Sequence, residues 1–437
     1  MRNPLLSYDE AAEQVNRFVL ALATGTEIPA ALGQPPSPAA PPTSRISELL
    51  PLESACGRVL ATPITADRDQ PAFPRSTRDG FACRAAEANT HGWLFQAGLV
   101  RAGQLPDRPL ATGEILEIMT GATLPEGADC VLMLEHVEHG DGFVRQLVGR
   151  TIAPGDNFVP RGAECRVGDT LVPAGVRLTP AQIAVAAQCG YRELAVHPRP
   201  RVAILSSGDE LVPHDQVPGP GQIRNSNTPM LAAMVAAAGA VPVPMAIVHD
   251  TPDALDSAIR AALEPAARID LLLITGGISV GKFDLVAPAL TRCGARFFFG
   301  GVAIQPGKPV AFGSLTRTAQ PGSAPGPLPF FALPGNPISS AVTFQLFALP
   351  LLTALAEDTA IQPRFARARL IGTWKGKSGL MRFLPAWCDF QPHPTVQLIP
   401  WQGSGDLAAF AASNCYLVVP ADKDTLEDAK SVTILLR

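Results

Sequence analysis

Hydrophobic residues recur at helical spacing near the start of the chain, over residues 8–24 and directly after Ser7, which can cap a helix. From about residue 58 to residue 170 the pattern changes to short apolar runs separated by Gly and Pro. This change predicts a β-rich, barrel-like or sandwich-like region. A further helix is predicted over residues 179–190, with Pro180 at its first position and Gly190 at its end.

Strand-like and helix-like runs alternate from residue 199 to about residue 355. The predicted strands cover residues 201–205, 241–248 and 270–274, and the predicted helices cover residues 228–238, 251–263 and 284–293. Such alternation is typical of a doubly wound α/β domain, which binds ligands at the carboxyl ends of its strands. Alternating runs near the end of the chain predict a small β module there, at residues 366–371 and 416–419.

Composition narrows the classes of function. With 437 residues, of which 47% are hydrophobic and 17% charged, the chain can bury the cores of two to four modules. A net charge of −4 argues against nucleic acid as the main partner. Eight cysteines stand singly without zinc spacing, as in reduced cytosolic proteins. No export segment is evident, and the apolar stretch 341–356, which contains Pro350, is expected to be a core helix. We therefore expect a cytoplasmic protein that does not span a membrane.

Three glycine-rich turns follow one another in the second half of the chain, at residues 275–284, 305–309 and 333–337. The first turn follows a predicted buried strand, and a strand, a glycine turn and a helix together aim backbone N–H groups at an anion. Gly276 and Lys282 have P-loop spacing, but Phe283 stands where that motif needs a Ser or Thr hydroxyl. The turns therefore predict an anion site other than that of ordinary nucleoside triphosphate hydrolysis.

Carboxylates are expected at adjacent strand ends beside these turns. Glu210 follows the first strand of the α/β region, Asp250 follows the second, and Asp284 follows the glycine turn. Three such carboxylates beside an anion-binding turn predict a Mg²⁺ site for a phosphorylated ligand. The alternative for Asp284 is a simple helix cap, and the alternative for the segment 206–211 is an ordinary acidic turn.

Other loops carry weaker signals. Lys308 is a flexible positive charge between two prolines, suited to phosphate or molybdate, with a solvated turn lysine as the alternative. The segment 333–340 predicts a strand-to-helix turn whose helix N-terminus can bind a ligand. On their own, the turns at residues 76–81 and 119–127, Arg382 and Ser404 are better explained as ordinary structure.

Six motifs follow a fixed order along the chain: Ser-x-x-Asp-Gly, Met-Thr-Gly-Ala, Ser-Ser-Gly-Asp-Glu-Leu, Thr-Gly-Gly-Ile-Ser-Val-Gly-x-x-Asp, Pro-Gly-Lys-Pro and Leu-Pro-Gly-Asn-Pro. In this order they closely resemble the molybdopterin molybdenumtransferase family (the MoeA type, also seen in the gephyrin E domain). The resemblance covers nearly the whole chain and implies an elongated homodimer with four subdomains per chain. The expected bounds are 1–69 plus 169–198 for an N-terminal helical or linking subdomain, 70–168 for the β-rich inserted subdomain, 199–358 for the α/β molybdopterin-binding domain and 359–437 for a C-terminal β module.

The resemblance also implies a reaction. Members of the family take adenylylated molybdopterin and molybdate, cleave the adenylate with release of AMP, and insert molybdenum into the pterin dithiolene with the help of Mg²⁺. Molybdopterin adenylyltransferase and molybdoenzyme clients are implied as further partners. Matched residue by residue, the family implies catalytic roles for Asp79, Glu210, Asp250 and Asp284, the last three as metal ligands. It implies substrate binding by Thr120, Gly276, Gly277, Ser279, Gly281, Lys308, Pro334, Gly335, Asn336, Pro337, Arg382 and Ser404.

Two departures from the family pattern concern charge. Gly301 and Gln305 stand where some members carry lysines, so the predicted cleft loses positive charge. Arg75 and Arg78 stand beside the Ser-x-x-Asp-Gly motif, where Asn and Met are usual. Two alternative functions remain: a non-catalytic molybdopterin-binding scaffold, which the acidic trio disfavours, and a molybdopterin adenylyltransferase, which the flanking modules disfavour.

Overall fold

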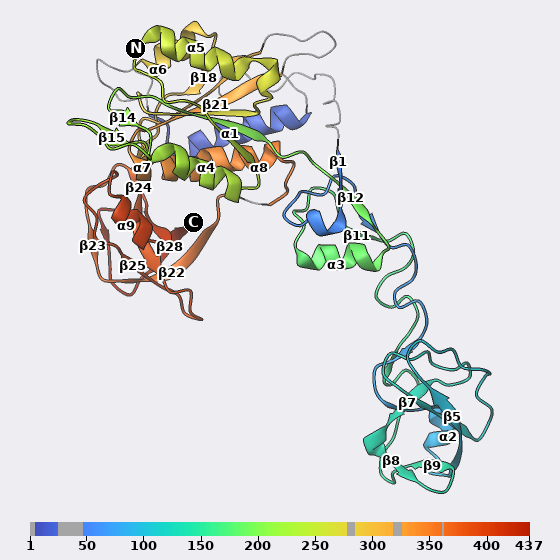
Figure 1. Ribbon diagram of the computed structural model, residues 1–437. Helices are drawn as coiled ribbons and strands as arrows, with labels where there is room; N and C mark the ends of the chain where they lie inside the picture. Colours follow the sequence, from blue (N-terminus) through green and yellow to red (C-terminus); the bar gives the residue numbers. More distant parts are fainter. Residues whose placement is uncertain (1–4, 25–46, 278–284, 318–325, 361) are drawn as a thin grey trace.

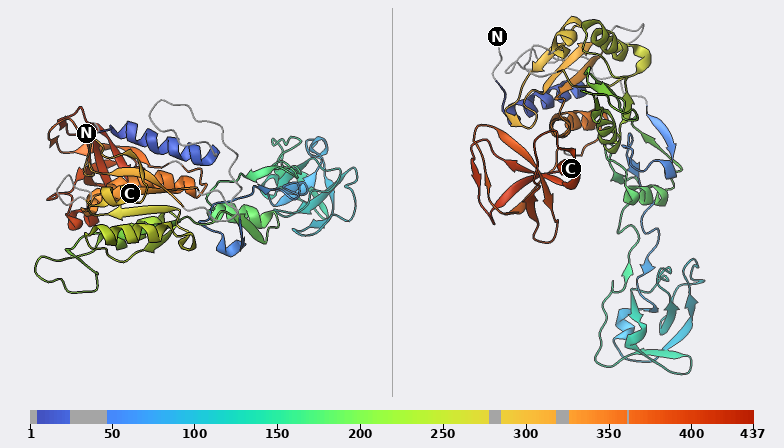
Figure 2. Two further views of the ribbon diagram at one scale, coloured as in Figure 1. Left: turned by 90° about the horizontal axis from the view of Figure 1, so that it is seen from above. Right: turned by 60° about the vertical axis from the view of Figure 1, so that its left-hand side comes forward.

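The computed structural model describes residues 5–24, 47–277, 285–317, 326–360 and 362–437. The molecule is elongated (Figure 1). An α/β domain and the C-terminal module lie together at one end, and a small linking region joins them to a separate β-rich domain at the other end. The two further views in Figure 2 show the same separation.

The α/β domain is built on a six-stranded sheet. In spatial order its strands are β16 (Val241–Pro244), β13 (Arg201–Ser206), β17 (Leu271–Thr275), β21 (Pro327–Leu333), β20 (Ala311–Thr316) and β18 (Arg296–Phe299). The first four are parallel, and β20 runs antiparallel to both of its neighbours. The parallel strands have few polar side chains because both faces of the sheet are covered by helices.

Helices pack on both faces of this sheet. One face carries α5 (Pro252–Leu263) and α6 (Val286–Arg292), with the short 3₁₀ turn η3 (Pro265–Ala267) after α5. The other face carries α1 (Tyr8–Thr24), α4 (Asn227–Ala237), α7 (Pro337–Thr343), the π-helical turn η4 (Phe344–Ala348) and α8 (Leu349–Leu355). A mainly parallel sheet with helices on both faces confirms the predicted doubly wound α/β domain.

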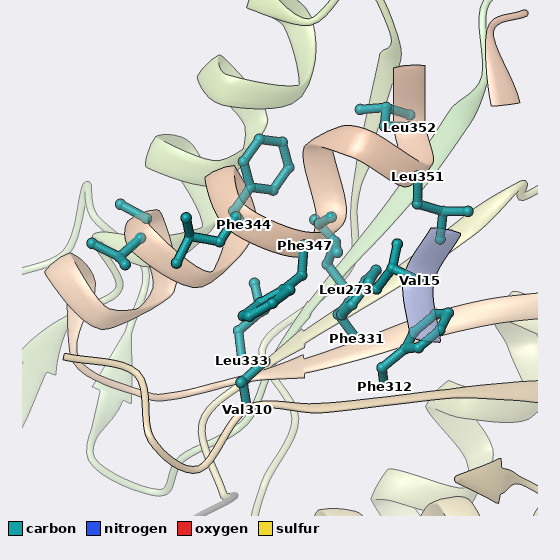
Figure 3. Close-up of a cluster of buried hydrophobic side chains, with 14 of the residues drawn as sticks. Val15, Leu273, Val310, Phe312, Phe331, Leu333, Phe344, Phe347, Leu351 and Leu352 are labelled. Carbon is teal, nitrogen blue, oxygen red and sulfur yellow. The ribbon is translucent and has the colours of Figure 1, made fainter. Parts of the chain in front are cut away.

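Aromatic and aliphatic side chains fill the core between the sheet and the second helical layer (Figure 3). Phe347 of η4 lies beside Leu333 of β21, while Phe331 stacks on Phe312 of β20 with ring centroids 4.6 Å apart. Phe18 of α1 meets Phe312 from the far side at 5.3 Å. This packing fixes the end of β21, and therefore the turn that follows it, in one position.

The helical run Pro337–Leu355 is 19 residues long, and by length and composition alone it could cross a membrane. Of its most apolar window, 78% is buried inside the protein, and a core helix passes the same test. The prediction of a core helix here is confirmed, but Pro350 does not break the helix. It is the second residue of α8, which follows the π-helical turn η4 without a gap, so the interruption that a proline causes in a continuous helix coincides with this turn.

One predicted strand is shorter than expected. The run 241–248 forms strand β16 only as far as Pro244. Pro242 and Pro244 are tolerated in it because β16 is an edge strand and the neighbouring donors are the alternate residues, with Val241 N donating to Pro200 O at 2.8 Å and Met245 N to Ile204 O at 2.9 Å. Beyond that point the chain stays beside β13 through single hydrogen bonds, including one from Val248 N to Ser206 O at 2.9 Å. Asp250 therefore follows an irregular segment and not a strand, although it remains beside the end of β13.

The linking region joins two distant stretches of the chain. Strand β1 (Glu48–Pro51) pairs with β12 (Glu193–Val196), and β2 (Ile64–Thr65) pairs with β11 (Thr170–Val172). The 3₁₀ turn η1 (Leu52–Ser54) and helix α3 (Pro180–Gln188) pack against them, and Thr179 and Gln182 form a capping box at the start of α3. Arg177 fastens this region to the α/β domain by donating to Ala238 O at 3.1 Å and to Asp358 Oδ2 at 2.8 Å.

The distant β-rich domain contains a second six-stranded sheet. Its order is β7 (Cys130–Met133), β4 (Gly80–Cys83), β6 (Glu114–Ile118), β5 (Leu94–Val100), β9 (Phe143–Gln146) and β8 (Val137–His139). The remaining elements are α2 (Ala85–Ala88), the 3₁₀ turn η2 (Leu134–His136), and the paired strands β3 (Arg75–Ser76) and β10 (Phe158–Val159). Two separate apolar clusters lie on the sheet, so this domain has a core of its own.

The C-terminal module closes into a small barrel. Strands β24 (Met381–Cys388), β25 (Thr395–Leu398), β22 (Phe365–Ile371), β28 (Ser431–Leu436) and β26 (Cys415–Val419) pair in this order, and β26 pairs back with β24. Strand β19 (Ile304–Gln305) of the α/β region joins the edge of β24. Helix α9 (Leu407–Ala412) and the pair β23 (Trp374–Lys375) and β27 (Thr425–Leu426) complete the module. Phe383 and Tyr416 extend from the barrel into the core of the α/β domain.

Candidate active site

A cavity of about 640 Å³ opens at the carboxyl ends of β13, β17 and β21, where a doubly wound sheet binds its ligands. Its walls come from three parts of the α/β domain and from the start of α9 in the C-terminal module. The lining residues that the sequence predicted as site residues are Glu210, Gly276, Gly277, Pro334, Gly335, Asn336 and Pro337. Two of the three predicted glycine turns therefore meet at one cavity, and the third contributes Pro309.

The turn after β17 is possible only with glycine. Gly276 has a φ of +99°, and a Cβ atom there would lie 2.2 Å from the carbonyl oxygen of Ser207. Gly277 also has a positive φ, of +58°, with Val286 of α6 directly against it. The missing side chains bring bare backbone to the cavity wall, which is the arrangement that lets N–H groups approach an anion.

Asn227, the first residue of α4, connects the two turns that line the cavity. Its side-chain nitrogen Nδ2 donates to Thr275 Oγ1 at 2.8 Å and to the carbonyl oxygen of Gly335 at 2.6 Å. Ser340 donates to the carbonyl oxygen of Pro334 beside it. One buried amide thus fixes the ends of β17 and β21 relative to α4, so the two turns keep a constant spacing.

The C-terminal module supplies another wall. Asn336 Nδ2 donates to Ser404 Oγ at 2.9 Å, and the backbone N–H of Ile338 donates to Ser404 O at 3.0 Å. Gly405 and Leu407, which follow, line the cavity. Ser404 itself does not line it, so the structure places this predicted residue as a support for Asn336.

The predicted carboxylates differ in position. Glu210 lines the cavity, with its side chain folded back over Gly208, whereas Asp250 does not line it. Burial raises the pKa of Asp250. The charges of Asp209 and Glu210 raise the pKa further. Neither Asp250 Oδ1 nor Ser207 Oγ has a hydrogen-bond partner among the described residues. Asp284 lies outside the described residues, as do Ser279 and Gly281.

Within the described ranges, no three His, Cys, Asp or Glu side chains are grouped so that they could hold a metal ion. Glu210 and the nearby Asp250 offer carboxylate oxygens. Asp209 Oδ1 already accepts a hydrogen bond from Asp250 N at 3.1 Å and lies 3.1 Å from His249 Nδ1. Mg²⁺ usually needs only one or two protein carboxylates together with phosphate oxygens and water. The donor set therefore fits a Mg²⁺ ion that is shared with a phosphorylated ligand.

Neither of the predicted cations lines the cavity. Lys308 is exposed, next to the lining residue Pro309. Arg382 is only 8% exposed, lies in register with Gln305 across the β19–β24 ladder, and has its guanidinium 5.6 Å from the ring centroid of Trp374. It donates to Leu380 O at 3.1 Å and has no carboxylate partner in the part of the chain that the structure describes. A mostly buried guanidinium without a counter-ion favours an anionic ligand.

Asp79 and Thr120 lie in the distant β-rich domain and not at the cavity of their own chain (Figure 1). Asp79 Oδ1 accepts hydrogen bonds from Thr120 N at 2.6 Å and from Thr120 Oγ1 at 2.8 Å. These bonds, the backbone one first, lower the pKa of the Asp79 carboxyl group. Asp79 is therefore an ionised, exposed carboxylate bonded to Thr120, and within a single chain neither residue reaches the cavity.

Several lining residues were not predicted from the sequence as site residues, namely Ser206, Ser207, Arg224, Asn225, Ser226, Asn227 and Thr275. A usable signal existed in Arg224-Asn-Ser-Asn227, a polar run directly before an apolar helix. Such a run suggests polar groups at a helix start. It has no glycine, however, and it stands far in sequence from the turns that it meets in space.

Three family models together match most of the chain. The MoeA N-terminal region (domain I and II) matches residues 6–190, a probable molybdopterin binding domain matches residues 203–354, and the MoeA C-terminal region (domain IV) matches residues 367–436. These ranges include every module described above.

Relatives match over nearly the full length. The molybdopterin molybdenumtransferase of Bacillus subtilis (strain 168) is 32% identical, over 89% of this chain and 90% of its own. The enzyme of that name from Nostoc sp. is 33% identical, over 89% of this chain and 88% of its own. Among solved structures, a molybdopterin biosynthesis MoeA protein from Pyrococcus horikosii superimposes with a TM-score of 0.72 at 28% identity, covering 99% of both chains. The motif order, the modules and these relatives agree, and the chain belongs to the MoeA family of molybdopterin molybdenumtransferases.

Proposed function

We propose that this chain is a molybdopterin molybdenumtransferase that cleaves adenylylated molybdopterin, releases AMP and inserts molybdenum from molybdate into the pterin dithiolene. The observation that carries the proposal is the cavity, in which two glycine turns meet at the carboxyl ends of β17 and β21. Its size suits a ligand larger than a simple anion, because cavities for small molecules usually measure ~300–1,000 Å³.

Different residues at the cavity have different roles in binding the substrate. The backbone at Gly276 and Gly277 approaches the anionic part of the substrate, while Asn227 and Asn336 hold the turns in place. Lys308, next to the lining residue Pro309, and Arg382, on the β19–β24 ladder, provide positive charge for molybdate. Glu210 is the carboxylate closest to the reaction because it alone of the described predicted acids lines the cavity. Cleavage of a phosphoanhydride needs such positioning together with neutralisation of the developing charge.

Mg²⁺ is part of this proposal. Bound with the substrate, it would neutralise phosphate oxygens, and Glu210 with Asp250 would hold it from the protein side. The raised pKa of Asp250 supports this assignment, because a cation nearby would relieve the repulsion among Asp209, Glu210 and Asp250.

A homodimer is the second structural part of the proposal. Asp79 and Thr120 match family positions that face the substrate, yet within one chain they lie far from the cavity (Figure 2). A second copy could bring its own β-rich domain to this cavity, which would join the two halves of the site. We also propose a cytoplasmic location, with molybdopterin adenylyltransferase and molybdoenzyme clients as transient partners.

The test is to incubate the purified protein with adenylylated molybdopterin, Mg²⁺ and molybdate, and to measure AMP and active cofactor. Glu210→Ala is expected to abolish release of AMP, whereas Glu264→Ala, an exposed acid on the same domain, is expected to have no effect. Binding of the pterin without release of AMP by the unsubstituted protein would instead favour a non-catalytic scaffold. Mixing Glu210→Ala with Asp79→Ala tests the dimer, since activity should return only if each copy supplies half of a site.

A further inference from the structure

The cavity carries very little charge for a site that must hold phosphates. Of its nineteen lining residues, all of them in the described part of the chain, only Glu210 and Arg224 ionise. Arg224 is therefore the one cation on the wall itself, and it comes from a segment without a glycine turn.

Arg224 is an exposed residue at the end of a short ladder. Strands β14 (Leu211–Val212) and β15 (Ile223–Arg224) pair in parallel, with Val212 in register with Arg224. The ladder is extended by Ile223 N donating to Glu210 O at 2.8 Å and by Asn225 N donating to Val212 O at 2.9 Å. The next residues enter α4, so Arg224 sits between a short ladder and a helix start.

The side chain of Arg224 is oriented but not neutralised. Its Nε donates to the carbonyl oxygen of Gln216 at 2.9 Å, which directs the planar guanidinium group. No Asp or Glu of the described chain forms an ion pair with it, and its two terminal nitrogens have no partner among the described residues. Those nitrogens form the flat pair of donors that matches two oxygens of a phosphate group.

The start of α4 adds to the same positive field. α4 has eleven residues, and its N-cap residue Ser226 makes no side-chain capping bond, although Asn225 Oδ1 accepts from Thr228 N at 3.1 Å. A helix start of this kind carries partial positive charge. Arg224, Ser226 and Asn227 all line the cavity, so the charged side chain and the helix start act on one ligand.

Resting on the proposed function, we propose that Arg224 binds a phosphate group of the adenylylated pterin. Arg224 is a substrate-binding residue on the α4 side of the cavity. The group that it recognises is a phosphate ester. Molybdate belongs to the separate region near Arg382 and Lys308.

AMP and adenosine, which differ only in the phosphate, are suitable probes for calorimetric titration of the full-length protein. Arg224→Ala should weaken binding of AMP about five- to tenfold, as expected for loss of one charge-assisted pair at a partly solvated site, and should leave adenosine unchanged. Arg224→Lys should restore part of the affinity. Arg260→Ala, which removes an exposed charge from α5 outside the cavity, should match the unsubstituted protein.

The inference would be overturned if Arg224→Ala and Arg260→Ala bound AMP equally well, or if adenosine and AMP lost affinity to the same extent. It would also be overturned if Arg224→Ala mainly raised the molybdate concentration needed for half-maximal cofactor formation. Failure of the proposed function would appear separately, as absence of AMP release by the unsubstituted protein.

Discussion

Arg177 fastens the linking region to the α/β domain, and its removal should have a large and measurable cost. The guanidinium group donates to Asp358 Oδ2 at 2.8 Å, to Gly57 O at 2.9 Å and to Ala238 O at 3.1 Å. It also lies over Gly239, where a Cβ atom would be 2.2 Å from Nη1. One side chain therefore joins two segments of the linking region to the end of α4 and to Asp358, three residues after the end of α8.

The magnitude follows from burial. The Asp358 side chain is only 3% exposed, and removing one member of a buried ion pair costs about 3–5 kcal/mol. The Arg177 side chain is 32% exposed, so solvent screens part of the interaction. We expect Arg177→Ala to lower the free energy of unfolding by about 2–3 kcal/mol.

The assay is urea unfolding followed by far-ultraviolet circular dichroism, with separate fits if more than one transition is seen. Arg177→Ala, Asp358→Ala and the double variant form a cycle, with Arg192→Ala as an exposed control in the same region. The coupling energy between Arg177 and Asp358 should exceed about 1.5 kcal/mol. A coupling below about 0.5 kcal/mol would refute the reasoning, because the two side chains would then contribute independently.

Three further outcomes are expected. Asp250→Asn should stabilise the protein near neutral pH, because the raised pKa of Asp250 means that its charged form is unfavourable in the folded state. This gain in stability should disappear as the pH falls below the ordinary pKa of Asp, and thermal unfolding at several pH values would measure it. Arg437→Ala removes bonds of 2.6 Å to Phe410 O and 2.7 Å to Ser413 O, and should speed amide exchange in α9, as measured by mass spectrometry. Asn227→Ala should cost about 1–3 kcal/mol in urea unfolding and weaken AMP binding, because the carbonyl of Gly335 loses its donor.

The features of this molecule that could be predicted from the sequence are those that neighbouring residues in the chain determine. Gly276 and Gly277 could be identified because a turn with positive φ and no room for a Cβ atom requires glycine, whatever the rest of the fold. The alternation of strands and helices likewise follows from local hydrophobic spacing.

The parts that sequence reasoning missed depend on distant contacts. Asn227 serves the cavity because it reaches Thr275 and Gly335, which are 48 and 108 residues away in the chain. Asp250 was expected at the site because it follows a strand in sequence, yet the cavity wall is formed by Glu210 and not by Asp250. The polarity of a side chain indicates that it needs a partner, but only the fold determines which partner it meets.

The pairing of β19 with β24 ties the barrel to the rest of the chain, which limits how the barrel can be removed or exchanged. Gln305 and Arg382 are neighbours on one ladder, and Tyr8 of α1 packs on Phe365 and Phe383 of the barrel at ring distances of 6.3 Å. A truncated gene product that ended before the barrel would expose these rings and leave β19 as a bare edge, which invites aggregation. A chimaera that takes its barrel from a relative must therefore keep residues in α1 and β19 that match the new barrel.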